Sequence, residues 1–97
     1  MAISISKQYT STGAKDPIDL NASHSVTFGV KSNTGDAVFT IEHYLGKVGA
    51  GGWYDSGQDV TEGQAYTTLG TIENMRINIS SMGTASSVNL DVIGSNR

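Results

Sequence analysis

Apolar residues in this chain recur at every second position, in short runs that glycine-rich turns separate. They alternate with polar residues over Phe39–Leu45, over Met75–Ile79 and again over Val88–Val92. Successive side chains of a β-strand point to opposite faces, so each run predicts a strand with one buried face. Twelve glycines, few leucines and many serines and threonines favour turns and strands over helices. The chain is therefore expected to be all-β.

Turn residues divide the chain into about eight short strands. Asn33–Asp36 is a turn, and it predicts a hairpin between Val26–Val30 and Ala37–Leu45. The polar segment Gln8–Pro17 is expected to be irregular, with a turn at its end. This spacing is typical of a single antiparallel β-sandwich or jelly-roll-like domain. The expected strands span residues 3–6, 18–20, 26–30, 37–45, 53–55, 64–69, 72–79 and 88–93.

Composition narrows the classes of function. The chain has 97 residues and no cysteine, so disulfides, thiolate nucleophiles and cysteine-bound metals are excluded. A chain of this size buries only about 60–65% of the surface that its unfolded form exposes. Small secreted domains often need disulfides, so a chain without cysteine is expected to be used in a reducing compartment or to be stabilised by assembly. A net charge of −3 and six scattered Lys and Arg residues argue against nucleic-acid binding. No apolar run approaches the length that a membrane helix needs, and the first residues do not follow a signal-peptide pattern, so we expect neither feature.

The sequence offers no catalytic set. His24 and His43 are the two histidines, and no Gly-x-Ser-x-Gly motif accompanies them. His43 shares the alternating apolar face of its run, so we expect a partly buried, packed strand residue. We therefore predict no catalytic residue and no enzyme activity.

No cofactor or metal is predicted either. Asp55, Asp59 and Glu62 surround a glycine turn, but their spacing matches no EF-hand, and solvated turn carboxylates are the simpler interpretation. The loop Gly46–Gly52 lacks the Gly-Lys-Ser/Thr ending of a phosphate-binding loop and no helix follows it. We expect a loop that acts, if at all, by docking on a neighbour.

The aromatic residues carry two alternative interpretations. Trp53 is expected to be the main core residue, whereas Tyr44 and Tyr66 fall on faces opposite the apolar sets and are candidates for an exposed contact surface. The alternative is a small carbohydrate-binding module in which Tyr44, Tyr66 or Trp53 stacks on sugar rings.

From Asp36 onward the chain resembles a known group of proteins. The order is Ala37–Glu42, a glycine loop, Trp53–Asp55, a threonine-rich strand, Met75–Ile79 and a final Val-x-Leu-x-Val. This order of strands and turns resembles small β-sandwich structural proteins of tailed bacteriophages, such as capsid decoration (cement) proteins and tail accessory domains. The resemblance covers about two-thirds of the chain and includes no diagnostic motif.

The resemblance implies a non-enzymatic virion protein, made in the host cytoplasm, that binds and stabilises major capsid or tail subunits and forms a homo-oligomer. It also implies that residues 1–17 are a polar N-terminal arm with a short edge strand, and that residues 18–97 are the sandwich. The edge strand is expected to add to a neighbour's sheet. No nucleic acid, membrane or cofactor is expected as a partner. The candidate interface residues are Ile3, Ile5, Tyr9, Tyr44, Lys47, Trp53 and Tyr66.

Overall fold

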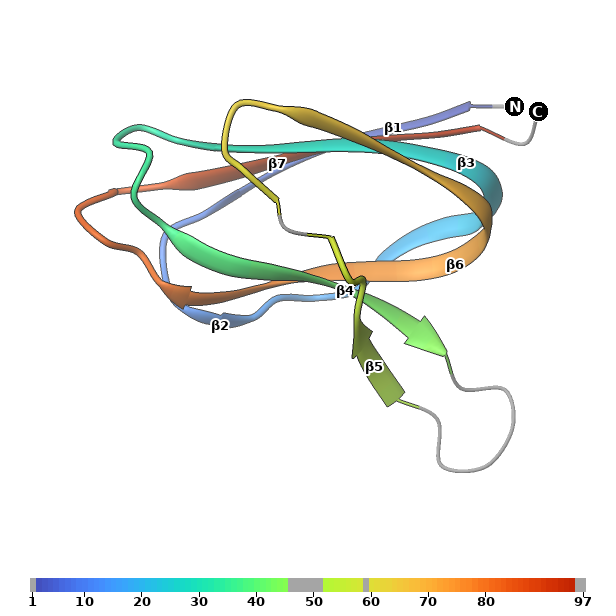
Figure 1. Cartoon of the computed structure of the whole chain (residues 1–97), viewed down its shortest axis with the longest axis horizontal. Coiled ribbons are helices and arrows are strands. Elements are labelled where there is room, and N and C mark those ends of the chain that lie inside the picture. The colour runs from blue at the N-terminus through green and yellow to red at the C-terminus, as the bar shows by residue number, and fades with distance from the viewer. Residues whose placement is uncertain (1, 46–51, 59, 96–97) are drawn as a thin grey trace.

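The computed structural model describes residues 2–45, 52–58 and 60–95, and all its regular elements are strands (Figure 1). The described part of the chain contains no helix that is long and apolar enough to cross a membrane. The strands are β1 (Ala2–Tyr9), β2 (Gly13–Ala14), β3 (Ile18–Ser32), β4 (Val38–Leu45), β5 (Gly52–Asp55), β6 (Ala65–Ser81) and β7 (Val88–Ser95).

Two long strands, β3 and β6, run through both layers of a sandwich. Ser25–Gly29 of β3 pairs with residues 65–69 of β6, whereas Ile18 and Asp19 pair with residues 74–75. The first pairing lies in a layer whose strand order is β1-β7-β3-β6. The second lies in the other layer, in which β6 also pairs with β2 and with β4, and β4 pairs with β5. All pairings are antiparallel. The expected β-sandwich is confirmed, and the described part of the chain forms seven strands, of which two serve both layers.

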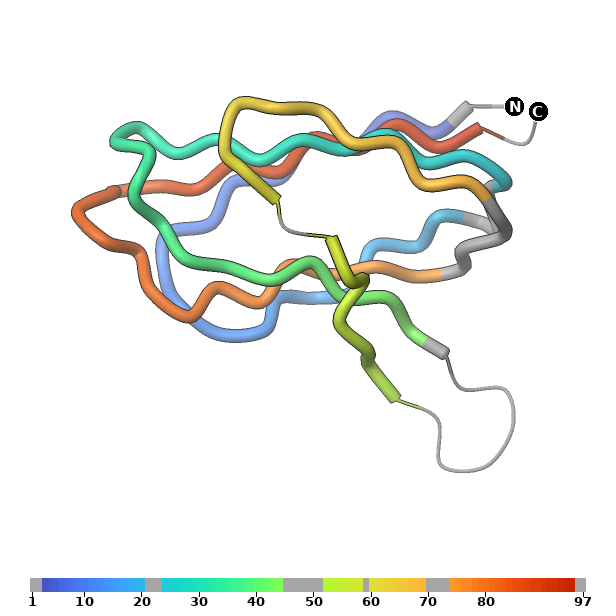
Figure 2. Tube along the Cα trace, in the orientation of Figure 1, coloured from blue at the N-terminus to red at the C-terminus, as the bar shows by residue number. Residues whose placement is uncertain are grey.

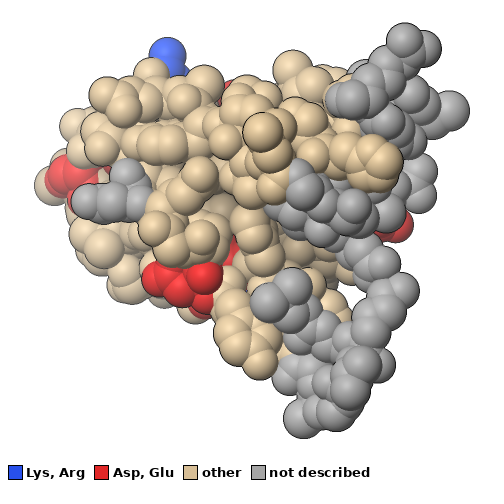
Figure 3. Space-filling view, turned by 45° about the vertical axis from the view of Figure 1, so that its right-hand side comes forward, with Lys and Arg blue, Asp and Glu red and all other residues tan. Residues whose placement is uncertain are grey.

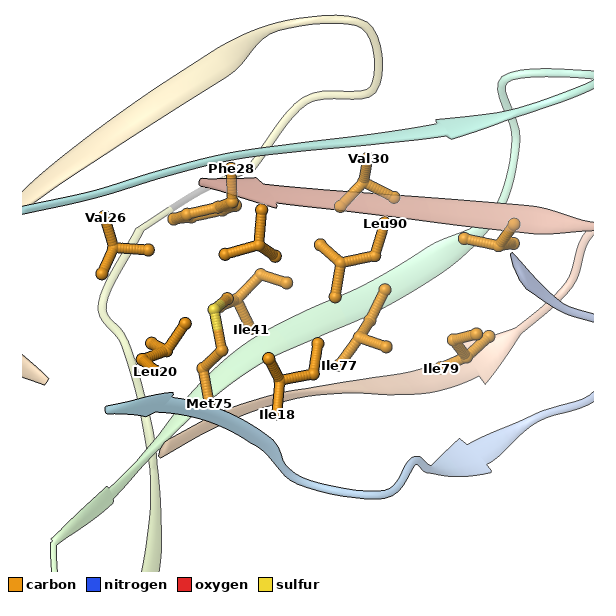
Figure 4. Close-up of a cluster of buried hydrophobic side chains, with 12 residues drawn as sticks. Ile18, Leu20, Val26, Phe28, Val30, Ile41, Met75, Ile77, Ile79 and Leu90 are labelled. Carbon is orange, nitrogen blue, oxygen red and sulfur yellow. The ribbon is translucent and has the colours of Figure 1, made fainter. Parts of the chain in front are cut away.

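The core lies between the layers and follows the period of two. Val26, Phe28 and Val30 of β3, together with alternate residues of β7, point toward the layer that contains β4. Every second residue of β6 from Met75 to Ile79 points back toward β3 and β7 (Figure 4). Alternation therefore decided which face each strand buries. The buried set is Ile18, Leu20, Val26, Phe28, Val30, Ile41, Met75, Ile77, Ile79, Val88, Leu90 and Val92.

The hairpin predicted between β3 and β4 is wrong. β3 pairs with β6 and β7, and β4 pairs with β5 and β6, so the turn at 33–36 passes between layers. Turn residues specify a chain reversal, but they do not specify which strand accepts the hydrogen bonds. The side chains of this turn bind another turn instead. Asn33 Oδ1 accepts hydrogen bonds from the backbone N–H of Ser86 (3.0 Å) and Ser87 (3.4 Å).

Asp36 completes the contact between these two turns. Its carboxylate accepts hydrogen bonds from the backbone N–H (2.9 Å) and the hydroxyl (2.8 Å) of Thr84, and from the hydroxyl of Thr34. Gly83 lies directly against it with φ +60°, and a Cβ at that position would come within 2.5 Å of the Asp36 carbonyl oxygen. Only glycine accommodates both that backbone conformation and that approach.

The described residues 2–17 do not form the separate arm that the resemblance implied for residues 1–17. β1 pairs with β7 over eight consecutive residues, from Ala2 opposite Ser95 to Tyr9 opposite Val88. β2 pairs with β6 within the segment expected to be irregular. The two chain ends therefore lie side by side in one layer (Figure 2). Ile5 and Tyr9 pack against the core, which accounts for the incorporation of this segment into the sandwich.

Candidate functional site

Trp53 is not a core residue, contrary to the prediction. It lies opposite Tyr44 in the β4–β5 pair, on the outward face of the layer, and the two rings meet edge to face with centroids 5.2 Å apart. β5 is a four-residue strand at the end of its sheet, and its residues are half-buried or exposed. The Arg76 guanidinium lies over the Trp53 ring, 4.4 Å from its centroid. Trp53 therefore belongs to a half-buried surface cluster.

The same arginine ties β6 to β4. Arg76 Nε donates to Glu42 Oε1 at 2.6 Å, and Asn78 Nδ2 donates to Glu42 Oε2 at 3.5 Å. Arg76 and Glu42 are only 22% and 16% exposed, so solvent screens this pair weakly. Tyr44, 37% exposed, is the most accessible aromatic ring of the outward face beside this ion pair. The expectation of an exposed Tyr44 is confirmed.

Tyr66, the other predicted contact residue, is partly buried and packs against the core. Its ring stacks on Phe28 with centroids 5.8 Å apart and planes inclined by 24°. Its hydroxyl accepts a hydrogen bond from the backbone N–H of Thr61 (2.7 Å) and donates to Gln64 Oε1 (3.4 Å). Neither face of Ala65–Leu69 is clearly apolar, so the alternation did not identify the inward face there, and the assignment of Tyr66 to the face opposite the apolar residues is wrong.

His43 is half-buried, as expected, and burial lowers the pKa of its imidazole. Its Nε2 atom is buried without a hydrogen-bond partner among the described residues. The neutral ring therefore dominates at neutral pH.

The carboxylates weighed as metal ligands have other partners. Glu62 accepts hydrogen bonds from the backbone N–H of Ser32 (2.6 Å) and of Ala37 (3.1 Å), and Asp55 accepts one from Gly57 (2.8 Å). In the described part of the chain, no group of three potential ligands lies together. Asp59 and Lys47, and the loop around Lys47, lie outside the described residues.

The remaining interface candidates lie on β1, which forms one edge of its layer. Among the described strands β1 pairs only with β7, so alternate residues turn their N–H and C=O groups outward. Ile3, Ile5 and Tyr9 point toward the interior side and are partly buried. Ser4 and Ser6 face outward, and Ser6 donates to Asp91 Oδ1 at 2.5 Å. Among the described strands, β1 thus has one unpaired backbone edge, and its side that faces the interior of the sandwich is partly apolar.

A hollow of about 330 Å³ lies beneath the end of β1. Lys7 and Tyr9 of β1 line it together with Ala14 of β2 and the three residues that follow β2. Lys15 Nζ lies 5.8 Å from the Tyr9 ring centroid and donates to Ser11 Oγ (2.9 Å) and the Thr12 carbonyl (3.0 Å). Burial, followed by the Asp16 charge, raises the pKa of the Tyr9 phenol, so the phenol keeps its proton at neutral pH. The lining residues are Lys7, Tyr9, Ala14, Lys15, Asp16 and Pro17.

Sequence reasoning included Tyr9 among the interface candidates but missed the lysines beside it. Lys7 and Lys15 are eight positions apart, and they come together only because the chain leaves one layer after β1 and enters the other at β2. The sequence signal for this site was the alternation of Ile3 and Ile5, because Lys7 and Tyr9 continue it on the same strand face.

Searches of protein-family models, of curated proteins and of solved structures find no significant match to this chain.

Proposed function

We propose that this protein is a non-enzymatic structural subunit that binds neighbouring subunits through the free edge of β1. The observation that carries the proposal is that β1 spans eight residues and pairs on one side only, among the strands described. Exposed edges of this length attract further strands, and proteins recruit partners by adding a strand to such an edge. Figure 3 shows a face dominated by uncharged residues, with charged side chains as separate spots, which is suited to contact with another protein.

The assembly we propose is the virion of a tailed bacteriophage, with capsid decoration as the role and major capsid or tail subunits as partners. The support is the resemblance in strand order, together with a small sandwich made without cysteine. A homo-oligomer fits the same proposal, because repeated subunits on a particle follow its symmetry. Light scattering over a range of concentrations measures that oligomeric state directly.

The virion proposal is tested by looking for the protein in particles. Virus particles are purified on a density gradient from the source culture, and an antibody raised against the chain is used to probe each fraction. We expect the protein to comigrate with the particles in stoichiometric amount. A protein that stays at the top of the gradient, with none in the particle fractions, contradicts the proposal.

The role of the edge is tested with two proline variants, Ile3→Pro and Ser4→Pro. Adjacent residues of an edge strand turn their N–H groups in opposite directions, so one proline removes a bond to β7 and the other removes a free edge donor. The variant that keeps the wild-type Tm is expected to lose particle binding. If that variant binds particles as the wild type does, the β1 edge is not the contact.

A second candidate function is carbohydrate binding at the outward face of β4 and β5. The observation in its favour is that Tyr44 and Trp53 are adjacent there, beside the polar groups of Glu42 and Asn78. Arg76 lies over the Trp53 ring, so Tyr44 is the better stacking platform. Titration of a broad glycan panel, followed by tryptophan fluorescence, tests this function. Sugar-dependent quenching supports it, and a Tyr44→Ala variant that quenches equally contradicts it.

A further inference from the structure

The hollow beneath β1 is positioned to contact any strand that adds to the β1 edge. Neighbouring strands lie about 4.8 Å apart, and alternate side chains of an added strand point to the interior side of the layer. On that side Lys7 and Tyr9 of β1 line the hollow together with Lys15 and Asp16. One side chain of an added strand can therefore enter the hollow while its backbone pairs with β1.

The charge of the hollow is opposite to that of the whole chain. Lys7 and Lys15 are two of only six Lys and Arg residues in a chain of net charge −3, and Asp16 is the one carboxylate in the lining. Lys15 is held in place by its two hydrogen bonds and by the Tyr9 ring. Lys7 is exposed and has no ion-pair partner among the described residues. Among the described residues, the site thus offers one oriented ammonium group, that of Lys15, and one without an ion-pair partner, that of Lys7.

We propose that the β1 edge and this hollow together bind an extended segment of a partner protein that carries a carboxylate side chain, Glu or Asp, at the position facing the hollow. This inference rests on the proposed function and specifies the chemistry of the partner. The backbone of the segment pairs with β1, and its carboxylate pairs with Lys7 and Lys15. Hydrogen bonds between ionised groups are about twice as strong as neutral ones. An acidic segment is therefore bound in preference to other segments, which backbone pairing with β1 alone would not distinguish.

The same lysines disfavour two other occupants. An apolar strand at the edge would cover the Lys7 ammonium without giving it a partner, and inward-facing charges on edge strands protect proteins from such pairing. A second copy of β1 is also a poor occupant, because residues 2–9 contain no Asp or Glu and would bring another lysine. The partner is therefore a different segment, and it is acidic.

The test uses three blocked heptapeptides of sequence Thr-Ser-Val-X-Val-Ser-Thr, in which X is Glu, Gln or Lys. Each is titrated into the ¹⁵N-labelled full-length protein, and the backbone amide shifts of β1 report binding. We expect the Glu peptide to bind about fivefold or more tightly than the Gln peptide, and the Lys peptide to bind most weakly. The preference should shrink as salt is raised, because exposed charges are screened.

Charge reversal identifies the residues responsible. In Lys7→Glu the preference is expected to invert in favour of the Lys peptide. The matched control is Lys31→Glu, which makes the same charge change at an exposed residue of β3 outside the hollow and should leave the preference unchanged. A Lys15→Gln variant should reduce the preference without inverting it.

Three results overturn the inference. If the three peptides bind β1 equally, the hollow does not select charge, although strand addition itself stands. If the Glu preference survives Lys7→Glu, the ammonium group is not its source. If no peptide shifts the β1 amides at its solubility limit, the hollow does not bind extended segments, and the particle experiment alone decides the proposed function.

Discussion

Asp36 stabilises the contact between two turns only while its carboxylate is ionised. Hydrogen bonds from Thr34, and then from Thr84, hold the pKa of Asp36 below its ordinary value. A depressed pKa in the folded state means that the stabilisation is complete above the ordinary Asp pKa. It is lost as pH falls from about 4 through the depressed value. We predict that Asp36→Asn lowers Tm at neutral pH and flattens the acid limb of a Tm–pH profile.

The matched control for this prediction is Asp55→Asn, which makes the same change at a carboxylate that accepts one local hydrogen bond from Gly57 and joins no turns. Its Tm at neutral pH should fall less than that of Asp36→Asn, because its hydrogen bond is local. Identical acid limbs in Asp36→Asn and the wild type would show that Asp36 contributes nothing to the pH dependence.

Arg76 combines two interactions that lysine cannot combine. Its planar guanidinium lies over Trp53 while Nε donates to Glu42. We predict that Arg76→Ala lowers the free energy of unfolding by about 1–2 kcal/mol, and that Arg76→Lys recovers little of it, because an ammonium group is compact and does not stack. Urea unfolding measures the stability, and a red shift of Trp53 emission reports exposure of the ring. Full recovery by lysine would contradict this account.

β1 is part of the sandwich, so its removal should damage the fold. Deleting residues 2–9 uncovers the side of β7 and the core residues beneath Ile5 and Tyr9. We predict that the shortened chain loses cooperative thermal unfolding and binds a hydrophobic dye, as loosely packed states do. Ser6→Ala is the control, because it removes one surface hydrogen bond to Asp91 and keeps the strand. A deletion variant that unfolds cooperatively at the wild-type Tm would restore the idea of a detachable arm.

Period-two alternation was sufficient to predict the fold class and most buried residues, because each apolar run must face a second layer. It could not predict strand partners. The residues between Leu20 and Val26, and those around Gly70, interrupt the apolar pattern, so β3 and β6 were each divided into two strands. Continuity of a strand through a register shift depends on its neighbours rather than on its own sequence.

The candidate site could be predicted only in part, for the same reason. Ile3 and Ile5 indicated an edge strand from their own alternation. That Lys7 and Lys15 line the same hollow depends on where the chain crosses between the layers. Trp53 was assigned to the core because of its size. Its position is decided instead by β5, which lies at the end of the sheet and presents the ring outward.

The whole molecule depends on one core between two layers, and the surface aromatic cluster is secondary to it. Phe28 is 1% exposed and stacks on Tyr66, which packs against that core. We predict that Phe28→Ala lowers the free energy of unfolding by about 3–5 kcal/mol, and that Trp53→Ala lowers it by less than half as much. Chemical denaturation of both variants provides the comparison. A larger loss for Trp53→Ala would contradict this assignment of the core.

The open edge of β1 links the fold to the proposed role, and hydrogen exchange of the full-length protein measures it directly. In the free protein, alternate amides of β1 should exchange rapidly, because no other described strand accepts hydrogen bonds from their N–H groups. When purified particles are added, the account predicts that these same amides become protected while those of β4 and β5 keep their rates. Protection confined to β4 and β5, with β1 unchanged, would contradict it and would place the contact on the aromatic face.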